Sequence, residues 1–578
     1  MNGSFWCSGC RVHGGTARRR QLTAGCRYSI DDMRVLSAAE MQVCDRVTTE
    51  QFGVPSLKLM RAASAAVAAF AREHFPKVQR VTVLCGRGNN GGDGMMTARM
   101  LATAGLKVTT ILLGTPEGMA GDAAAAWREL ASPAHGLIHV VKSAEELPQY
   151  KTALDTDLIV DAVVGTGFTP PLKGMALAAL EWIKGNAAPV LAIDLPSGWP
   201  ADSYEASLET PVFPGDAVIT FTAPKPAHVF GQLTRRWDQP IVVAPIGSPD
   251  AAIVSEMQLT WAGSAHTLTE QPRAADSNKG KFGHVLVIGG SVGKSGAPAM
   301  TSLTAMRAGA GLVTAAVPAP VLPQVSAYAP ELMTWPLHAN SAGQIASKGL
   351  TPELFESLTS GKTVLAVGPG LGQGPGVVKL LRSVFAETKI PTVIDADALN
   401  VLAADPHLAA KLGKLGNEGR TFVLTPHPGE MARLAGKSVA EIQANRLDVA
   451  RSFAQKNGVT LVLKGWRTLI AHPDGSVAVN TTGNPSMAKG GSGDMLTGLI
   501  AGLLAQYKNE TARAVEAAVY LHGLAADLAV LETDEHTLLP TDSLREFSRA
   551  FRFRSCRPNG YVWLQGHCTE APSTRVEK

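Results

Sequence analysis

The chain alternates short apolar runs rich in β-branched residues with alanine-rich amphipathic stretches, and this alternation most constrains its fold. In the first half, helical patterns at 95–104 and 121–131 separate successive runs. Because the runs are apolar throughout, they are typical of strands that helices cover on both faces. The sequence therefore predicts a parallel sheet between two helical layers. Its strands are expected at 78–85, 106–114, 158–165, 190–196 and 216–223.

The same alternation restarts after residues 247–278, where the periodicity weakens and turn residues accumulate. A second α/β domain with its own core is therefore predicted. Its strands are expected at 283–290, 311–318, 363–370, 391–398, 421–426 and 460–465, and its helices at 297–309, 376–387, 439–455 and 513–529. We predict a disordered leader at 1–32, domains at 33–250 and 255–550, and a tail without regular structure at 551–578.

Length and composition agree with two large domains. At 578 residues the chain exceeds what one hydrophobic core normally holds. Its hydrophobic content of 45% and charged content of 18% are those of a globular protein, and no apolar run is long enough to cross a bilayer. A net charge of +4, with several arginines near the start, is too small to indicate nucleic acid binding. We therefore expect a small-molecule substrate, without nucleic acid or membrane partners.

Cysteine usage predicts a reducing compartment. Of seven cysteines, only Cys44 and Cys85 lie between the two chain ends, so no disulfide framework is indicated and we expect a cytoplasmic protein. Cys7 and Cys10 form a single CxxC without the second pair or the histidines of a zinc site. The arginine-rich leader resembles a transit peptide in composition, but we favour an unstructured or mis-assigned segment before a domain that begins at Met33.

Two short glycine motifs are misleading. Gly86, Gly88 and Gly91 match G-x-G-x-x-G after a strand, but the acid that would bind a ribose at the end of the next strand is missing. The segment GGSVGKS at 289–295 has one residue too few between its glycines for a P-loop. A conventional NAD fingerprint is therefore not supported, and the segment is not a Walker A motif.

In the first half, polar and glycine-rich segments follow three strands. RGNNGGDG (87–94) follows the first strand, and Asp161 and Asp194 each end a later strand before a glycine. Open α/β sheets bind ligands at the carboxyl ends of their strands, so we expect the three strand ends to converge on a site. Oxygen atoms of Asn90, Asp161 and the Ser197 region suit a hard cation, whereas the glycine turns suit a phosphate. Helix capping is the alternative for either aspartate alone.

In the second half, GNPSMAKGGSGD (483–494) precedes an apolar helical pattern. Glycine lets a ligand approach the backbone closely, and the amides of residues 491–493 would lie at a helix N-terminus. With Asp494 beside them, the segment predicts an oxyanion or phosphate cradle, and a glycine-rich turn capped by the aspartate is the alternative. Other polar residues at strand ends are Lys225, which would contact a phosphate or extend toward solvent, and Asp395, Asp397, His427, Lys464 and Arg467.

The longer motifs resemble two known families. RGNNGGDG, VDAVVGTG, AIDLPSGW and TAPK resemble the YjeF N-terminal family, the NAD(P)HX epimerases. KGKFGHVLVIGGS, GPGLG, IDADALN, LTPHPGE and GNPSMAKGGSGDMLTG resemble the ADP-dependent NAD(P)HX dehydratases, which have a ribokinase-like fold. Their order over about residues 33–550 is similar to that in the bacterial bifunctional NAD(P)HX repair enzymes. The resemblance implies an α/β chain with an N-terminal Rossmann-like YjeF domain and a C-terminal ribokinase-like domain.

The resemblance also implies a reaction. The substrate would be NADH or NADPH that carries water across a nicotinamide double bond. The first half, an isomerase, would interconvert the R and S hydrates, and the second half, a lyase, would remove the water at the expense of ADP. In the first half, K⁺ would be bound by Asn90, Asp161 and Ser197. The hydrated dinucleotide would contact Gly88, Asn89, Asn90, Gly91, Gly92, Gly165, Thr166, Gly167 and Asp194.

In the second half, the resemblance implies that Asp494 is the base that takes the proton from the substrate hydroxyl, while the amides of 491–493 stabilise the phosphoryl group passing to it. Mg²⁺ is expected with the nucleotide phosphates, and a homo-oligomer is expected for the whole chain. The nucleotide would contact Lys464, Gly465, Trp466, Arg467, Thr468 and Gly493. The hydrated cofactor would contact Ala297, Gly370, His427 and Asp494.

One segment departs from the family pattern. The family usually reads Leu-Met-Glu-Asn-Ala-Gly near its start, whereas LMRAAS (59–64) places Arg61 and Ala62 where the acid and the amide would be. Such a change would alter an interface or the epimerase site. Because of this departure, a second function is also considered: the chain would be a ribokinase-like small-molecule kinase whose N-terminal domain binds a dinucleotide without catalysis.

Overall fold

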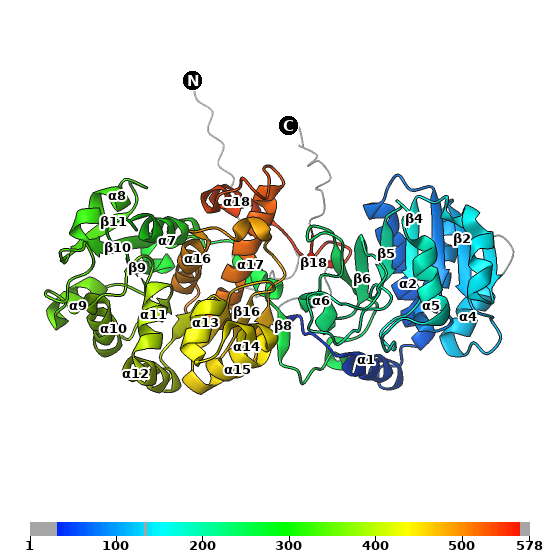
Figure 1. The fold of residues 1–578 in the computed structure, drawn as a ribbon, viewed down its shortest axis with the longest axis horizontal. Helices are drawn as coiled ribbons and strands as arrows, with labels where there is room; N and C mark the ends of the chain where they lie inside the picture. Colours follow the sequence, from blue (N-terminus) through cyan, green and yellow to red (C-terminus); the bar gives the residue numbers. More distant parts are fainter. Residues whose placement is uncertain (1–31, 132–135, 567–578) are drawn as a thin grey trace, which may run out of the picture.

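The computed structural model describes residues 32–131 and 136–566. They form two α/β halves that lie side by side, the first in blue and cyan at the right of Figure 1 and the second in green to orange at the left. Each half contains one largely parallel sheet, which confirms the predicted fold class.

Within the described residues, the first sheet has eight strands. In spatial order they are β18 (Val562–Gln565), β7 (Ile241–Ala244), β6 (Ala217–Phe221), β5 (Val190–Ile193), β4 (Leu158–Ala162), β1 (Arg80–Cys85), β2 (Lys107–Leu113) and β3 (Leu137–Val141). Neighbours are parallel except β18 and β7. The chain direction across the sheet reverses between β1 and β4, which is the position where such sheets bind ligands.

The second sheet has ten strands among the described residues. In spatial order they are β11 (Met333–Leu337), β10 (Leu312–Pro318), β9 (His284–Ile288), β12 (Val364–Val367), β13 (Thr392–Ile394), β14 (Phe422–Leu424), β15 (Thr460–Leu463), β16 (Leu469–Ala471), β17 (Val477–Val479) and β8 (Leu259–Trp261). The first seven in this order are parallel, and β16 is antiparallel to both of its neighbours. Here the reversal lies between β9 and β12.

Helices connect the strands of each sheet. In the first half they are α1 (Ala38–Glu50), α2 (Ser56–His74), α3 (Asn89–Thr103), α4 (Gly121–Leu130), α5 (Gly174–Ile183) and α6 (Pro226–Phe230). In the second half they are α7 (Gly296–Arg307), α8 (Leu322–Ser326), α9 (Pro352–Thr359), α10 (Pro375–Glu387), α11 (Asp397–Ala404), α12 (Pro406–Asn417), α13 (Pro428–Ala435), α14 (Val439–Ala444), α15 (Arg446–Asn457), α16 (Ser492–Gln506), α17 (Thr511–Val530) and α18 (Pro540–Arg552).

The glycine-rich segment after β1 is helical. We expected a flexible turn at 87–94, whereas α3 begins at Asn89 and contains most of it. A Cβ atom at Gly91 would lie 1.9 Å from the carbonyl oxygen of Gly86, and one at Gly94 would lie 2.5 Å from the Ala162 side chain. These glycines therefore let α3 pack closely against the sheet, in addition to any contact with a ligand.

Each end of the described chain pairs with the opposite half (Figure 1). The Val35 amide donates to the carbonyl of Leu259 in β8, at 3.0 Å. At the other end, β18 adds to the first sheet, which differs from the tail without regular structure predicted at 551–578. An Asn559–Gly560 turn precedes this short strand, and pairing covers the otherwise open edge of β7. Residues 1–31 and 567–578 lie outside the described residues.

Candidate active sites

The first candidate site is a cavity of about 980 Å³ at the reversal point of the first sheet. The segments that follow β1, β4, β5 and β6 contribute to its wall, together with α1. Gly91 and Gly92, which were predicted to contact substrate, are buried in α3 and do not line the cavity. The predicted substrate residues that do line it are Gly88, Asn89, Asn90, Gly165, Thr166, Gly167 and Asp194.

The three predicted cation ligands are connected to one another. Ser197 donates its hydroxyl to Asp161 Oδ1 at 2.6 Å and its amide to Asp161 Oδ2 at 2.7 Å. Val164 joins this pair to Asn90, because its amide donates to Ser197 Oγ and its carbonyl accepts from Asn90 Nδ2 at 3.0 Å. The Asn90 Oδ1 atom is buried and accepts no hydrogen bond from the described residues. Burial, partly offset by the hydrogen bonds from Ser197, raises the pKa of Asp161 to about 6.

Asp194 and Lys225 form a buried ion pair after β5 and β6. Asp194 Oδ1 accepts hydrogen bonds from Lys225 Nζ and from Thr220 Oγ1, both at 2.7 Å. Burial raises the pKa of Asp194, but the charges of Lys225 and His228 and the hydrogen bonds from Lys225 and Thr220 together outweigh this effect and hold the pKa below its usual range. Lys225 is 2% exposed. Of the two roles predicted for it, extension toward solvent is therefore wrong.

Two more carboxylates line this cavity that we did not predict as site residues. Asp45 comes from α1 and Asp93 from α3, and each has a buried Oδ1 that accepts no hydrogen bond from the described residues. Burial raises the pKa of Asp45 to about 6, with Lys225 opposing the shift. Burial also raises the pKa of Asp93, and the charges of Asp194 and Asp45 add to this effect. Asp93 lies within RGNNGGDG, whereas no sequence signal marked Asp45.

The unusual Arg61 does not reach the first cavity. Its guanidinium donates to Glu129 Oε1 at 2.6 Å, and Arg99 pairs with the other oxygen of Glu129 at the same distance. Neither Arg61 nor Ala62 lines the cavity. The departure from the family pattern is therefore accommodated by a surface ion pair between α2 and α4.

The second candidate site is a cavity of about 430 Å³ at the reversal point of the second sheet. Three predicted substrate residues, Ala297, Gly370 and Asp494, line it together. Gly370 has a φ of +68°, and a Cβ there would lie 2.8 Å from the carbonyl oxygen of Lys294. A glycine is therefore needed where the segment after β12 approaches the start of α7. The cavity is also lined by Lys294, Asp397, Asn400 and Glu430.

Asp494 lies in the first turn of α16. The helix begins at Ser492 after Gly491, whose φ of +103° is left-handed, so residues 491–493 form a helix N-terminus as predicted. Burial raises the pKa of Asp494 to about 7, with the charge of Asp395 adding to the shift and Lys464 opposing it. A carboxyl group with a pKa near neutrality is suited to accept and return a proton.

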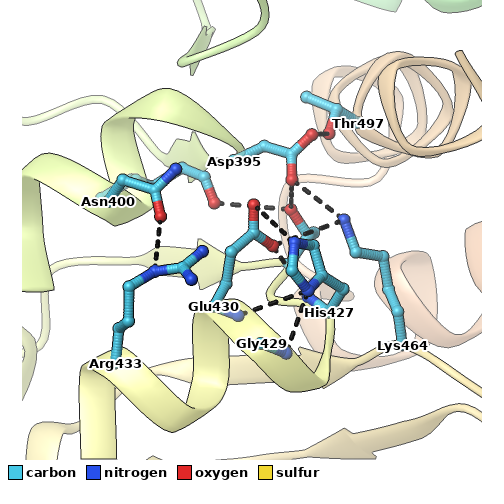
Figure 2. Close-up of polar contacts among 10 residues, drawn as sticks. Asp395, Asn400, His427, Gly429, Glu430, Arg433, Lys464 and Thr497 are labelled. Atoms are coloured by element: carbon cyan, nitrogen blue, oxygen red, sulfur yellow. Dashed lines mark hydrogen bonds and ion pairs between the residues drawn. The ribbon is translucent and has the colours of Figure 1, made fainter. Parts of the chain in front are cut away.

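Asp395 is the centre of a polar network beside this cavity (Figure 2). It accepts hydrogen bonds from Thr425 at 2.7 Å, from Thr497 at 2.8 Å and from Lys464 Nζ at 3.3 Å. A Cβ atom at Gly493 would lie 3.3 Å from the same Nζ. Lys464 and Gly493, both predicted to bind the nucleotide, are therefore neighbours.

His427 caps α13 and does not line the second cavity. Figure 2 shows its Nδ1 accepting from the amides of Gly429, at 3.0 Å, and Glu430, at 3.3 Å. Burial lowers the pKa of His427, and the nearby Lys464 adds to this effect. Because Nδ1 accepts these hydrogen bonds, the ring is neutral and its proton is on Nε2. The Nε2 atom lies 3.5 Å from Glu430 Oε1.

The other predicted nucleotide residues form a loop after β15 that contacts the first half. The Trp466 indole N–H donates to the carbonyl of Phe230 at 3.0 Å. Arg467 is buried and donates to the carbonyl of Gly231 at 3.2 Å and to Gln565 Oε1 in β18 at 2.5 Å. The structure thus places the Arg467 side chain in the contact between the halves, which sequence reasoning did not anticipate.

Fold and sites define a two-domain α/β protein with a separate small-molecule cavity in each domain. Residues 56–227 match the family described as the YjeF-related protein N-terminus, and residues 285–549 match that described as NAD(P)H-hydrate dehydratase. The chain is 39% identical to the bifunctional NAD(P)H-hydrate repair enzyme Nnr of Moorella thermoacetica over 89% of this chain and 95% of that protein. The corresponding Escherichia coli K12 enzyme is 35% identical over 87% of this chain and 91% of its own length. The chain therefore belongs to the family of bifunctional NAD(P)H-hydrate repair enzymes.

A solved structure is similar to the second half. It is the ADP/ATP-dependent NAD(P)H-hydrate dehydratase from Bacillus subtilis, co-crystallised with ATP and Mg²⁺. It is 33% identical, with a TM-score of 0.42, and the match covers 50% of this chain and 96% of that chain.

Proposed function

We propose that this chain repairs NADH and NADPH that have gained water across a nicotinamide double bond. The first half interconverts the R and S hydrates, and the second half removes water from the S hydrate at the expense of ADP. Family membership over most of the chain supports this assignment, as does the presence of one cavity at the reversal point of each sheet.

The position of Asp494 is the observation that carries the dehydratase assignment. Its carboxylate lines the cavity together with Ala297 and Gly370, and the N-terminus of α16 lies beside it. Asp494 takes the proton from the substrate hydroxyl while that oxygen attacks the terminal phosphoryl group of the nucleotide. The amides at 491–493 stabilise the charge on the transferred group. AMP is released, the C–O bond then breaks so that the oxygen leaves as phosphate, and the double bond reforms as the adjacent ring carbon loses a proton.

The nucleotide is proposed to bind between Lys464 and the start of α16. The Lys464 ammonium lies next to Gly493, and the backbone of 465–468 completes the contact. His427 is proposed to donate a hydrogen bond from its Nε2–H to the hydrated cofactor. Mg²⁺, when bound, neutralises charge on the nucleotide phosphates. No group of three or more His, Cys, Asp or Glu side chains in the described ranges is arranged to hold a metal, so the phosphates would supply ligands beside Asp397 and Glu430.

K⁺ is proposed to bind in the first half next to Asn90, Asp161 and Ser197. These residues fit a hard cation because the buried Asn90 Oδ1 has no donor among the described residues and the buried Asp161 carboxylate lies in the same network. When bound, the ion supplies positive charge that favours ionised Asp161. The site would thereby fix the segments after β1 and β4 that line the cavity.

A single assay tests the proposed function. Purified protein is given a mixture of R and S hydrates with ADP, Mg²⁺ and K⁺, and the recovery of reduced-nicotinamide absorbance is followed. Complete recovery supports both activities. Recovery that stops at the S fraction would contradict the epimerase assignment, and no recovery with either ADP or ATP would favour a small-molecule kinase.

Location and assembly stay predictions. Across residues 32–131 and 136–566, none of the helices is both long and apolar enough to cross a membrane. A cytoplasmic location and a homo-oligomer are proposed on the basis of the sequence. Fluorescence imaging of the tagged full chain and light scattering of the purified protein would test them.

A further inference from the structure

Inversion of the hydrated nicotinamide requires a proton donor and a proton acceptor. When water adds to the double bond of a dihydronicotinamide, the hydroxyl enters at the carbon beside the ring nitrogen, because the nitrogen lone pair stabilises positive charge there. The two epimers differ at this carbon. Breaking its C–O bond calls for a proton on the leaving oxygen, and adding water to the opposite face calls for a base.

The polar residues identified from sequence are already engaged in other interactions. Both oxygens of Asp161 accept hydrogen bonds from Ser197, and Asp161 does not line the cavity. Asp194 and Lys225 neutralise each other at 2.7 Å. A carboxylate held ionised by a lysine is a poor proton donor, and the Lys225 ammonium is already bound to Asp194 and Thr220.

Of the carboxyl groups that line this cavity, Asp45 and Asp93 each have a buried Oδ1 that accepts no hydrogen bond from the described residues. Glu50 and Asp122 also line the cavity, but neither has such a buried oxygen. Asp45 and Asp93 reach the cavity from separate helices, α1 and α3, and their charges interact with each other and with Asp194.

Lys225 opposes the rise in the pKa of Asp45, and Asp122 adds to the rise in the pKa of Asp93. Arg46, Glu50 and Arg87 also line the cavity. Repulsion between two buried carboxyl groups makes it costly to ionise both, so one can be the acid while the other is the base.

We propose that Asp45 and Asp93 are the catalytic acid and base of the epimerase, an inference that rests on the proposed function of the first half. The protonated carboxyl donates its proton to the substrate hydroxyl. The C–O bond breaks, the ring nitrogen lone pair forms a C=N⁺ bond, and water leaves. A water molecule then adds to the opposite face and gives its proton to the other carboxylate. The substrate is inverted, and the proton has moved from one aspartate to the other.

This arrangement suits a reaction that runs in both directions. After one inversion the two aspartates have exchanged roles, and they are ready for the reverse inversion without any further change. Neither a cofactor nor a metal ion has to supply the proton. The geometry therefore assigns proton transfer to Asp45 and Asp93, and leaves Asp194 and Lys225 to bind and orient the substrate.

The test compares Asp45→Asn and Asp93→Asn with Glu73→Gln, in which an exposed residue of α2 that does not line the cavity loses its charge. With ADP present, the S fraction is consumed first, and the slower phase reports enzyme-dependent epimerisation. Each aspartate variant is expected to slow that phase about 100-fold or more, whereas Glu73→Gln leaves it unchanged. Dehydration of the S fraction stays normal in all three, which shows that the chain is folded.

A second measurement tests the bond that breaks. In ¹⁸O-labelled water without ADP, the wild-type chain is expected to exchange the substrate hydroxyl oxygen at the rate of epimerisation, and both aspartate variants are expected to lose this exchange. Epimerisation within threefold of wild type in both variants, or inversion without label, would overturn the proposal. A wild-type chain that repairs the S hydrate but never inverts the R hydrate would instead overturn the proposed function of the first half.

Discussion

Each half has a lysine paired with an aspartate at the carboxyl ends of strands, the first pair lining its cavity and the second lying beside its cavity, and the two pairs differ in burial. Lys225 and Asp194 lie 2.7 Å apart, with side chains 3% and 12% exposed. Lys464 and Asp395 lie 3.3 Å apart, and the Lys464 side chain is 20% exposed. Lys225 is therefore buried against Asp194, whereas the ammonium of Lys464 is partly exposed beside Gly493.

The comparison shows that the sheet determines where each site lies, and that the helices around the site determine its chemistry. In the first half, α1 and α3 bring Asp45 and Asp93 to the cavity, which suits proton transfer to and from the oxygen atoms that leave and enter at one carbon. In the second half, α16 brings Asp494 and its helix N-terminus, which suits transfer of an anionic group. Similar parallel sheets therefore serve an isomerase and a lyase.

The largest effect is expected for Asp494→Asn. The amide keeps the shape of the side chain but cannot accept the proton, so dehydration should fall about 10²- to 10⁴-fold. Nucleotide binding and epimerisation should be unchanged, because the first cavity lies in the other half. Single-turnover dehydration of the S hydrate measures the loss, and near-normal turnover would remove Asp494 from its role.

Replacing each lysine separately sharpens the comparison of the two pairs. Lys225→Met leaves Asp194 as a buried, unpaired carboxylate, which should cost about 3–5 kcal/mol of unfolding free energy. Lys464→Met should cost less, because Asp395 keeps its hydrogen bonds from Thr425 and Thr497. Urea unfolding of the full chain measures both values. Equal losses would show that the burial difference between the pairs has no energetic consequence.

The pH dependence of dehydration is expected to follow Asp494. Its pKa of about 7 means that the ionised base is lost as the pH falls below 7. The kcat/KM for the S hydrate should therefore drop about tenfold for each pH unit below this value and stay level above it. A profile that is flat between pH 5 and pH 8 would contradict the assignment.

A smaller effect is expected for Trp466→Phe. The change removes only the N–H that donates to Phe230 across the contact between the halves, a hydrogen bond worth about 1 kcal/mol. The KM for ADP should rise a few-fold while kcat and epimerisation stay constant. An unchanged KM would show that the nucleotide loop holds its conformation without the first half.

The smallest effect is expected for Arg61→Ala. Its pair with Glu129 is exposed, and Arg99 remains to neutralise that carboxylate. Neither stability nor the rate of epimerisation should change measurably. A marked loss of epimerisation would restore the possibility that the departure at 59–64 reaches the first site.

The long apolar runs were sufficient to predict most of the sheet cores, and the long motifs were sufficient to predict some of the residues that line each cavity. Short strands such as β3, β7, β16 and β18 were missed because runs of only a few residues carry little periodic signal. Asp45 was missed for a different reason. It lies on α1, far along the chain from the strand ends, and only the packing of that helix brings it to the cavity.

The sequence by itself determined the two α/β halves, the location of both sites at strand ends, and the family. These features follow from local patterns, because periodicity and glycine motifs are read within short windows of the chain. Only the tertiary structure decided which carboxylates are paired, which are buried without a partner, and that Arg467 joins the two halves through Gly231 and Gln565. Burial and charge pairing depend on groups tens to hundreds of residues apart, and no local pattern records which of them will meet.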